Sequence, residues 1–259
     1  MKLTDRRGIL HMVDVISVLV ARDQKSRYKS TAMGVVWAVA SPVLFLLTFY
    51  LMFNIILPLN IPNYASHLFI GIIVWSWFQS TTMESVGCIV GNASLVNQPR
   101  FSPAALPLAS AASNLLTMGL TLPLLVVILA SQGAPFGLPL IALPILVMCQ
   151  FAFILAIAYL VAALNVRFRD LQYIVPILLQ LGYFATPIFY DLAAVPPETL
   201  QFLQLNPMLT LIEAYRRVLI DGHWPDWSAI ALTFLGSLVL LALTYRYFLR
   251  AGAGFLEEV

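Results

Sequence analysis

Six apolar stretches decide what this chain can fold into. They lie at about residues 33–57, 67–90, 104–130, 138–163, 172–190 and 228–249. A helix needs about 20 apolar residues to cross the hydrocarbon core of a bilayer. The chain has 61% hydrophobic residues, 10% charged residues and a mean hydropathy of +0.89. This composition excludes an ordinary water-soluble domain. The sequence predicts an all-α integral membrane protein with six transmembrane helices, all within a single transmembrane domain over residues 1–259.

The positive charges give these helices an orientation, because loops on the cytoplasmic side carry an excess of Lys and Arg. Four cations stand just before the first apolar stretch: Arg22, Lys25, Arg27 and Lys29. With the N-terminus inside, all 14 Lys and Arg residues except Arg216 and Arg217 fall on the inner side. We therefore expect a multi-pass protein whose N- and C-termini are both cytoplasmic.

The segment at about residues 8–31 is too interrupted by polar residues to span a bilayer. His11, Asp14 and Ser17 recur at three-residue spacing, and apolar residues form another face. This pattern predicts an amphipathic interface helix along the inner membrane surface. Its function has two open interpretations, a membrane anchor for the first transmembrane helix or a docking surface for a cytoplasmic partner.

The loop after the second apolar stretch is rich in Asn, Ser and Pro, and cannot continue a spanning helix. It places Phe101 beside Arg100. Such a pair can anchor the loop to lipid headgroups or insert into a groove of another protein, and the sequence leaves both open.

Residues 191–227, between the fifth and sixth stretches, are punctuated by prolines and too short to span. They predict two short outer-face helices, at about residues 198–205 and 208–221. Glu213 stands four residues before Arg217, the favourable order for an ion pair on a helix. These helices can cap the outer face or gate it.

Glu84 is the only carboxylate well inside a predicted span. A lone charge near the bilayer centre costs on the order of 3 kcal/mol, so its carboxylate has to face protein, water or the interface. We favour a bond to a neighbouring helix, or a reach toward the inner surface, over a role in transport. On the first helix, Phe45, Phe49 and Phe53 form an aromatic stripe, which packing alone can explain.

Several function classes are excluded by absent motifs. The sequence contains no phosphate-binding loop, no nucleophile elbow and no zinc-protease motif. Cys88 and Cys149 give neither a disulfide framework nor metal-ligand spacing. The spans also carry too few ionisable groups for a secondary carrier built on internal repeats. A self-contained membrane enzyme is therefore unexpected, and transport by this chain would draw its energy from elsewhere.

Four motifs in order give the chain a family resemblance. They are SRYKSTAMGVVWAVASP, NASLVNQPRFSPAALPL, LNVRFRDLQYIVPILLQ, and TPIFY followed by VPP and NPMLTLIEAYRRVL. Together they resemble the membrane (permease) subunit of ABC-2 type exporters of bacterial surface polysaccharides, such as O-antigen, teichoic acid and capsule. The resemblance covers nearly the whole chain.

The resemblance implies an inner-membrane homodimer that exports undecaprenyl-linked polysaccharide. ATP and Mg would bind to a separate cytoplasmic ABC ATPase subunit, so this chain would carry no cofactor, no metal and no catalytic residue, and its other contacts would be membrane lipids rather than nucleic acid. The resemblance places ATPase docking at His11, Asp14, Asn97, Arg100 and Phe101.

It also implies a channel between the first and fifth helices of both subunits. An aromatic track would line it: Phe45, Phe49, Tyr50, Phe53, Tyr183, Phe184 and Tyr190. At the inner mouth, Arg27 and Tyr28 would receive the lipid diphosphate, with ordinary headgroup anchoring as the alternative. The outer gate would comprise Pro187, Asn206, Pro207, Glu213 and Arg217.

Two rival functions stay open at this point. One keeps the permease architecture but changes the cargo to a drug, a lipid or a peptide. The other is a non-transport membrane scaffold, for which an outer gate would have no purpose.

Overall fold

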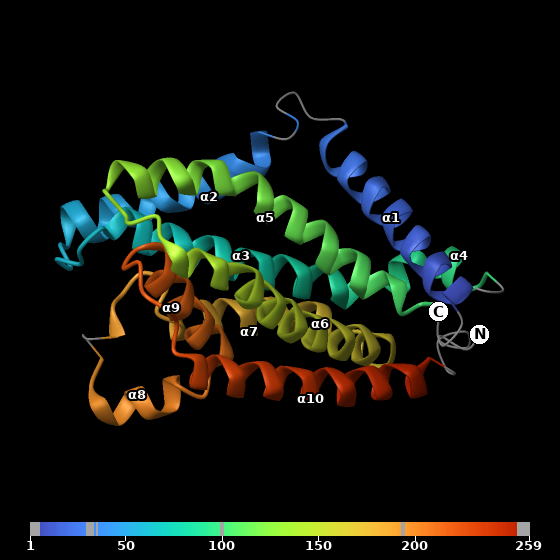
Figure 1. The fold of residues 1–259 in the computed structure, drawn as a ribbon. Coiled ribbons are helices and arrows are strands. Elements are labelled where there is room, and N and C mark those ends of the chain that lie inside the picture. Colours follow the sequence, from blue (N-terminus) through green and yellow to red (C-terminus); the bar gives the residue numbers. More distant parts are fainter. Residues whose placement is uncertain (1–5, 30–33, 35, 99–100, 193–194, 253–259) are drawn as a thin grey trace.

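The computed structural model shows a bundle of long helices (Figure 1). It describes the whole chain except residues 1–5, 30–33, 35, 99–100, 193–194 and 253–259, and every regular element in the described part is helical. The helices, in order, are α1 (Arg6–Tyr28), α2 (Val36–Tyr50), η1 (Leu51–Ile56), α3 (Tyr64–Gly87), η2 (Val90–Asn92), α4 (Ala93–Val96), α5 (Ala105–Ser131), η3 (Leu138–Ala142), α6 (Leu143–Arg167), α7 (Leu171–Ala185), α8 (Pro197–Leu203), α9 (Pro207–Leu219) and α10 (Trp227–Ala251).

The long helices α2, α3, α5, α6 and α10 run side by side along one direction (Figure 1). Helix α3 is the central one, since it packs against α2, α5, α6, α7 and α9. Its side chains Leu68, Phe69 and Trp77 are almost fully buried. We call the end of the bundle beside α4 the α4 end, and the opposite end, beside α8, the α8 end (Figure 1).

Four helical stretches of the described chain are long and apolar enough to cross a membrane: Val36–Ile56, Ala105–Ser131, Leu138–Arg167 and Trp227–Ala251. Helix α3 has 24 residues, but polar residues such as His67, Gln79 and Glu84 lower its hydropathy. Helix α7 is apolar but shorter. The structure thus confirms an all-helical fold with several candidate membrane spans, and the number six stays a prediction.

The predicted fifth span, residues 172–190, is too long by five residues. Helix α7 ends at Ala185, and Thr186 is extended, with φ −103° and ψ 138°. The cause is Pro187, which has no N–H to donate and disfavours helical geometry in the residue before it. The 15 residues of α7 rise only about 22 Å, so the chain leaves the helix before a full bilayer is crossed.

The other short elements lie close to their predicted positions. The predicted interface helix, residues 8–31, corresponds to α1, and the two predicted outer helices correspond to α8 and α9. Pro197 and Pro207 stand in the first turn of α8 and α9, where the missing N–H costs nothing.

Candidate functional site

A cluster of aromatic rings lies where α2, η1, α7 and the segment 186–190 meet. At its centre is Phe189, which the sequence analysis did not single out. Its ring centroid lies 5.2–6.4 Å from those of five predicted track residues: Phe49, Phe53, Tyr183, Phe184 and Tyr190. These separations suit favourable ring–ring contacts. The structure therefore brings most of the predicted track together around one unpredicted residue.

Two members of the predicted track lie apart from this cluster. Tyr50 contacts the ring of Tyr64 on α3, at 6.2 Å. Phe45 is 54% exposed and makes no ring contact within the described residues. Phe189 was missed because the predicted helix ran through residue 190, whereas the chain leaves the helix at Ala185. A proline two residues before an aromatic pair was the available signal.

A buried arginine holds the segment 186–190 in place. The side chain of Arg216, on α9, is 4% exposed. Its guanidinium donates to the carbonyl of His67 at 3.1 and 3.3 Å and to the carbonyl of Ile188 at 2.9 Å. It also pairs with the Glu213 carboxylate at 2.6 Å. Burial lowers the pKa of Arg216 and Glu213 opposes this shift, but an arginine stays charged in proteins.

The predicted ion pair between Glu213 and Arg217 is wrong. Glu213 pairs with Arg216, three residues later, and Arg217 is exposed. Both spacings bring helical side chains together, so tertiary contacts decide between them. The Arg216 guanidinium is buried because it donates to the carbonyls of His67 and Ile188. The Glu213 carboxylate pairs with it there.

Further hydrogen bonds fix the same segment from α3. The Tyr64 hydroxyl donates to the Phe189 carbonyl at 3.0 Å, and the His67 ring nitrogen Nε2 lies 3.3 Å from the Tyr190 carbonyl. Each bond connects the first turn of α3 to a residue of the aromatic cluster. The cluster is therefore positioned by polar contacts at the end of α3.

Asn206 connects α9 to the break after α7. Its side-chain oxygen accepts from the Met208 N–H at 3.0 Å, which caps α9, and its amide donates to the Thr186 hydroxyl at 2.8 Å. Of the predicted gate residues, Pro187 lies in this segment, Asn206 caps α9, and Pro207, Glu213 and Arg217 lie on α9. The gating role itself stays a prediction.

Gly71 allows α3 to approach the segment closely. A Cβ added there would lie 3.1 Å from the Ile188 carbonyl oxygen and 3.2 Å from Nη2 of Arg216. We expect Gly71→Ala to lower the free energy of unfolding by about 1–3 kcal/mol, since such overpacking forces neighbours to move. Thermal unfolding in detergent measures this. Gly119→Ala on α5, where no heavy atom lies within 4 Å of the new Cβ, is the control. It should leave stability unchanged or raise it slightly, because Ala favours a helix more than Gly does. Equal losses for the two variants would contradict the account.

A second polar cluster joins three helices nearer the α4 end. Arg27 of α1 pairs with Asp23 at 2.8 Å and with Glu84 of α3 at 2.6 Å. It also donates to Asn114 of α5 at 3.1 Å, and Asn114 donates to Glu84 at 2.8 Å. Ser113 bonds Asp23 in turn. This confirms the prediction that Glu84 bonds a neighbouring helix, and we call these five residues the α1 latch.

The latch borders a cavity of about 270 Å³ between α1, α2, α3 and α5. Its lining mixes Arg27 and Asn114 with hydroxyl groups and Trp37. Burial lowers the pKa of Arg27, but the carboxylates of Glu84 and Asp23 outweigh it, so the net pKa is raised. All three guanidinium nitrogens already have partners here. A lipid-diphosphate role for Arg27 stays a prediction, and the side chain of Tyr28 lies outside the described residues.

The described part of the predicted docking surface belongs to α1 and to the loop after α3. Arg22 of α1 donates to Asn92 at 2.9 Å, so the interface helix and the loop after α3 meet directly. Asp14 and Asn97 are exposed, and Phe101 is half-buried against the core. The side chain of His11 and the whole of Arg100 lie outside the described residues.

Within the described part of the chain, no group of three or more His, Cys, Asp or Glu side chains is placed to hold a metal ion. Cys88 and Cys149 are buried free cysteines.

Comparison with known sequences finds a family and individual relatives that agree with one another. The pattern of the family described as ABC-2 type transporter matches residues 14–220. The O-antigen export system permease protein RfbA of Myxococcus xanthus is 33% identical over 243 residues, which cover 93% of this chain and 94% of that protein. A Klebsiella pneumoniae protein of the same name is 28% identical over 95% of this chain and 98% of its own length. The polysialic acid transport protein KpsM of Escherichia coli is 25% identical over 88% of this chain and 89% of its own length.

Proposed function

Since the chain belongs to the ABC-2 type transporter family, we propose that it is the transmembrane subunit of an ATP-driven exporter of lipid-linked polysaccharide. The relatives named for O-antigen export and polysialic acid transport support polysaccharide as the cargo class. Undecaprenyl diphosphate is the proposed carrier, and the bacterial inner membrane the proposed location. The α4 end faces the cytoplasm, and two copies of the chain form the channel.

A cytoplasmic ABC ATPase subunit binds at the α4 end, where it supplies ATP and Mg. The docking surface comprises exposed residues of α1 and of the loop after α3, with Asp14 and Asn97 as described members. The α1 latch supports this assignment, because it connects the docking helix by charged hydrogen bonds to α3 and α5. A movement of α1 would therefore be passed on to two long helices of the bundle.

Six spans are proposed, with α3 and α7 added to the four that meet the length and hydropathy requirement. Helix α3 is counted as a span because it has 24 residues and a central position in the bundle. Helix α7 covers the rest of its span through the non-helical segment 186–190, which protein contacts hold. Irregular backbone at membrane depth is tolerated where protein buries it or a cavity is lined.

The aromatic cluster is the single observation that carries the polysaccharide proposal. Sugar rings present apolar C–H faces that stack on aromatic side chains, while their hydroxyl groups stay hydrated. The cluster gathers rings from α2, η1, α7 and the segment 186–190, and Asn206 and Arg216 hold that segment from the side of α9. Such a track of apolar rings suits a long polymer that slides without binding tightly.

The proposal is tested by purifying the chain together with the ATPase encoded beside it. ATP turnover is measured with and without the undecaprenyl-linked glycan from the same cells. Stoichiometric co-purification with glycan-stimulated turnover is the expected result. A stable complex that ignores glycan would indicate another cargo, such as a drug, lipid or peptide, and the lack of any ATPase partner would indicate a scaffold.

Phe189→Leu tests the aromatic track, because leucine keeps an apolar side chain but removes the central ring. Ring pairs contribute about 0.5–1.5 kcal/mol each, so the loss of this ring should lower glycan export about tenfold. Surface glycan in cells that depend on this protein is the readout. Phe45→Leu is the matched control on α2, because its ring is exposed and apart from the cluster. Equal glycan export by both variants would contradict a role of the aromatic cluster in export.

A further inference from the structure

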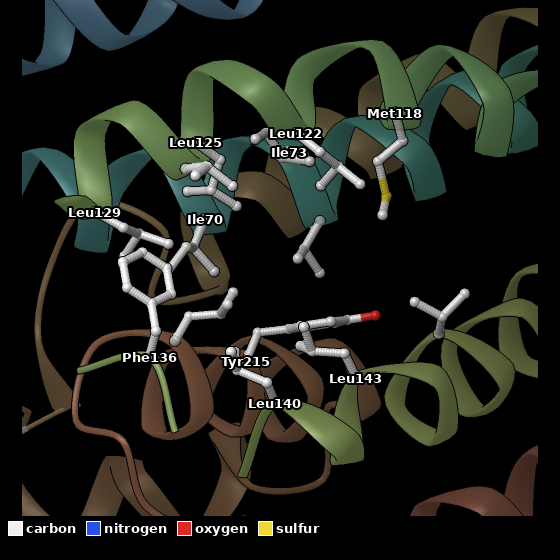
Figure 2. A pocket seen from close by; sticks show the side chains of 14 residues that line it. Ile70, Ile73, Met118, Leu122, Leu125, Leu129, Phe136, Leu140, Leu143 and Tyr215 are labelled. Atoms are coloured by element: carbon white, nitrogen blue, oxygen red, sulfur yellow. The ribbon is translucent and has the colours of Figure 1, made fainter. Parts of the chain in front are cut away.

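A second cavity, which shares only the lining residue Met118 with the cavity beside the α1 latch, lies in the half of the bundle nearer the α8 end. It has a volume of about 400 Å³ and is enclosed by α3, η3, the start of α6, α5 and α9. We call it the apolar slot and define it by Ile70, Met118, Leu125, Phe136, Leu143 and Tyr215. Figure 2 shows their side chains facing one another across an open space. The slot shares no lining residue with the aromatic cluster or the α1 latch.

The slot is elongated along the helix axes. Met118 and Leu129, both in its lining, are eleven residues apart on α5, a rise of about 16 Å. Its lining residues Leu122 and Phe136 are 42% and 55% exposed, so the slot opens sideways. On a protein whose long helices cross a membrane, that side faces hydrocarbon.

The chemistry of the lining selects the kind of ligand. No lining residue is charged, and the single oxygen among the lining side chains is the Tyr215 hydroxyl. This hydroxyl is buried without a hydrogen-bond partner in the described structure, and Figure 2 shows it pointing along the slot. A bound water needs two to four polar partners, which one hydroxyl does not supply. The slot therefore suits a hydrocarbon chain rather than water or a polar solute.

We propose that the apolar slot binds one acyl chain of a membrane phospholipid that enters from the leaflet at the α8 end. The length of the slot matches one acyl chain, whereas the much longer polyprenyl chain of a glycan carrier fits only in part. An empty space of this size would leave its walls without dispersion contacts. Because Tyr215 stands next to Arg216, the bound chain supports α9 against α5 and thereby the segment that Arg216 holds.

The test uses the full chain reconstituted in vesicles of phosphatidylethanolamine and phosphatidylglycerol. A trace of phosphatidylglycerol carries a photoactivatable diazirine on one acyl chain, and mass spectrometry locates the labelled residues. Leu122→Trp fills the slot from its open side. Leu120→Trp is the matched control, because Leu120 lies on the same helix with 39% exposure and does not line the slot.

Saturable labelling of slot residues, lowered about tenfold by Leu122→Trp and unchanged by Leu120→Trp, is the expected result. Three outcomes would overturn the proposal. The first is an absence of label in the slot. The second is labelling along all of α5 that Leu122→Trp does not change, which indicates ordinary contact with surrounding lipid. The third is labelling by a diazirine polyprenyl phosphate but not by the phospholipid, which would assign the slot to the glycan carrier.

Discussion

Arg216→Ala is expected to be the most damaging single substitution in this chain, lowering the free energy of unfolding by about 3–5 kcal/mol. The loss is large because the substitution leaves the partners of the guanidinium in place. The Glu213 carboxylate loses its cation, and the carbonyls of His67 and Ile188 lose their donor. Truncation leaves the buried carbonyls without a donor and the partly exposed Glu213 carboxylate without its cation, which costs more than the net contribution of the intact network.

Thermal unfolding of the detergent-solubilised protein measures the loss, and surface glycan in cells measures its functional effect. Arg217→Ala is the matched control, since it removes the same charge one residue later from an exposed position, where substitutions change stability by about 0.5 kcal/mol or less. Arg216→Lys should recover part of the stability, because one ammonium cannot reproduce the planar set of guanidinium donors. If Arg216→Ala and Arg217→Ala behaved alike, Arg216 would not hold the segment 186–190.

Breaking the α1 latch is expected to separate ATP turnover from export. Arg27→Ala removes a side chain of α1 that bonds both Glu84 and Asn114. Hydrogen bonds to charged groups contribute about 1.5–3 kcal/mol. The side chains of Arg27 and Glu84 are 25% and 35% exposed, so solvent screening reduces the coupling to about 1–2 kcal/mol.

A double-mutant cycle with Arg27→Ala and Glu84→Gln measures this coupling from thermal stability. The functional readout is the ratio of glycan exported to ATP hydrolysed, which should fall for both single variants while the ATPase remains bound. Lys25→Ala is the control, because Lys25 is an exposed cation on the same helix. Additive stability changes with an unchanged ratio would show that the latch does not transmit the movement of α1.

The helices could be predicted from the sequence because their causes are local. Long apolar runs, the amphipathic pattern of α1 and the prolines before α8 and α9 each define an element within a few residues. The end of α7 was wrong by five residues, although Pro187 was visible, because apolar composition continued through Tyr190. Hydropathy alone does not register the loss of a backbone N–H.

The contacts within the sites depended on tertiary structure and could be predicted only in part. The need of Glu84 for a partner followed from its charge, but no pattern indicated that the partner would be Arg27, 57 residues earlier. Arg216 stood out in the sequence only as one of two cations on the unexpected side of the membrane. Its burial depends on carbonyls from α3 and from the break after α7, which come together only in the fold.

The central claim is that this chain forms the path by which ATP hydrolysis moves a lipid-linked glycan across the membrane. The most direct measurement uses proteoliposomes that contain this protein and its ATPase, with the undecaprenyl-linked glycan on the ATPase side. Transfer is detected by a glycan-cleaving enzyme confined to the opposite side. The account predicts cleavage that requires ATP and both proteins and that Phe189→Leu slows. Cleavage without ATP, or its absence in a complex that hydrolyses ATP at full rate with the glycan present, would contradict it.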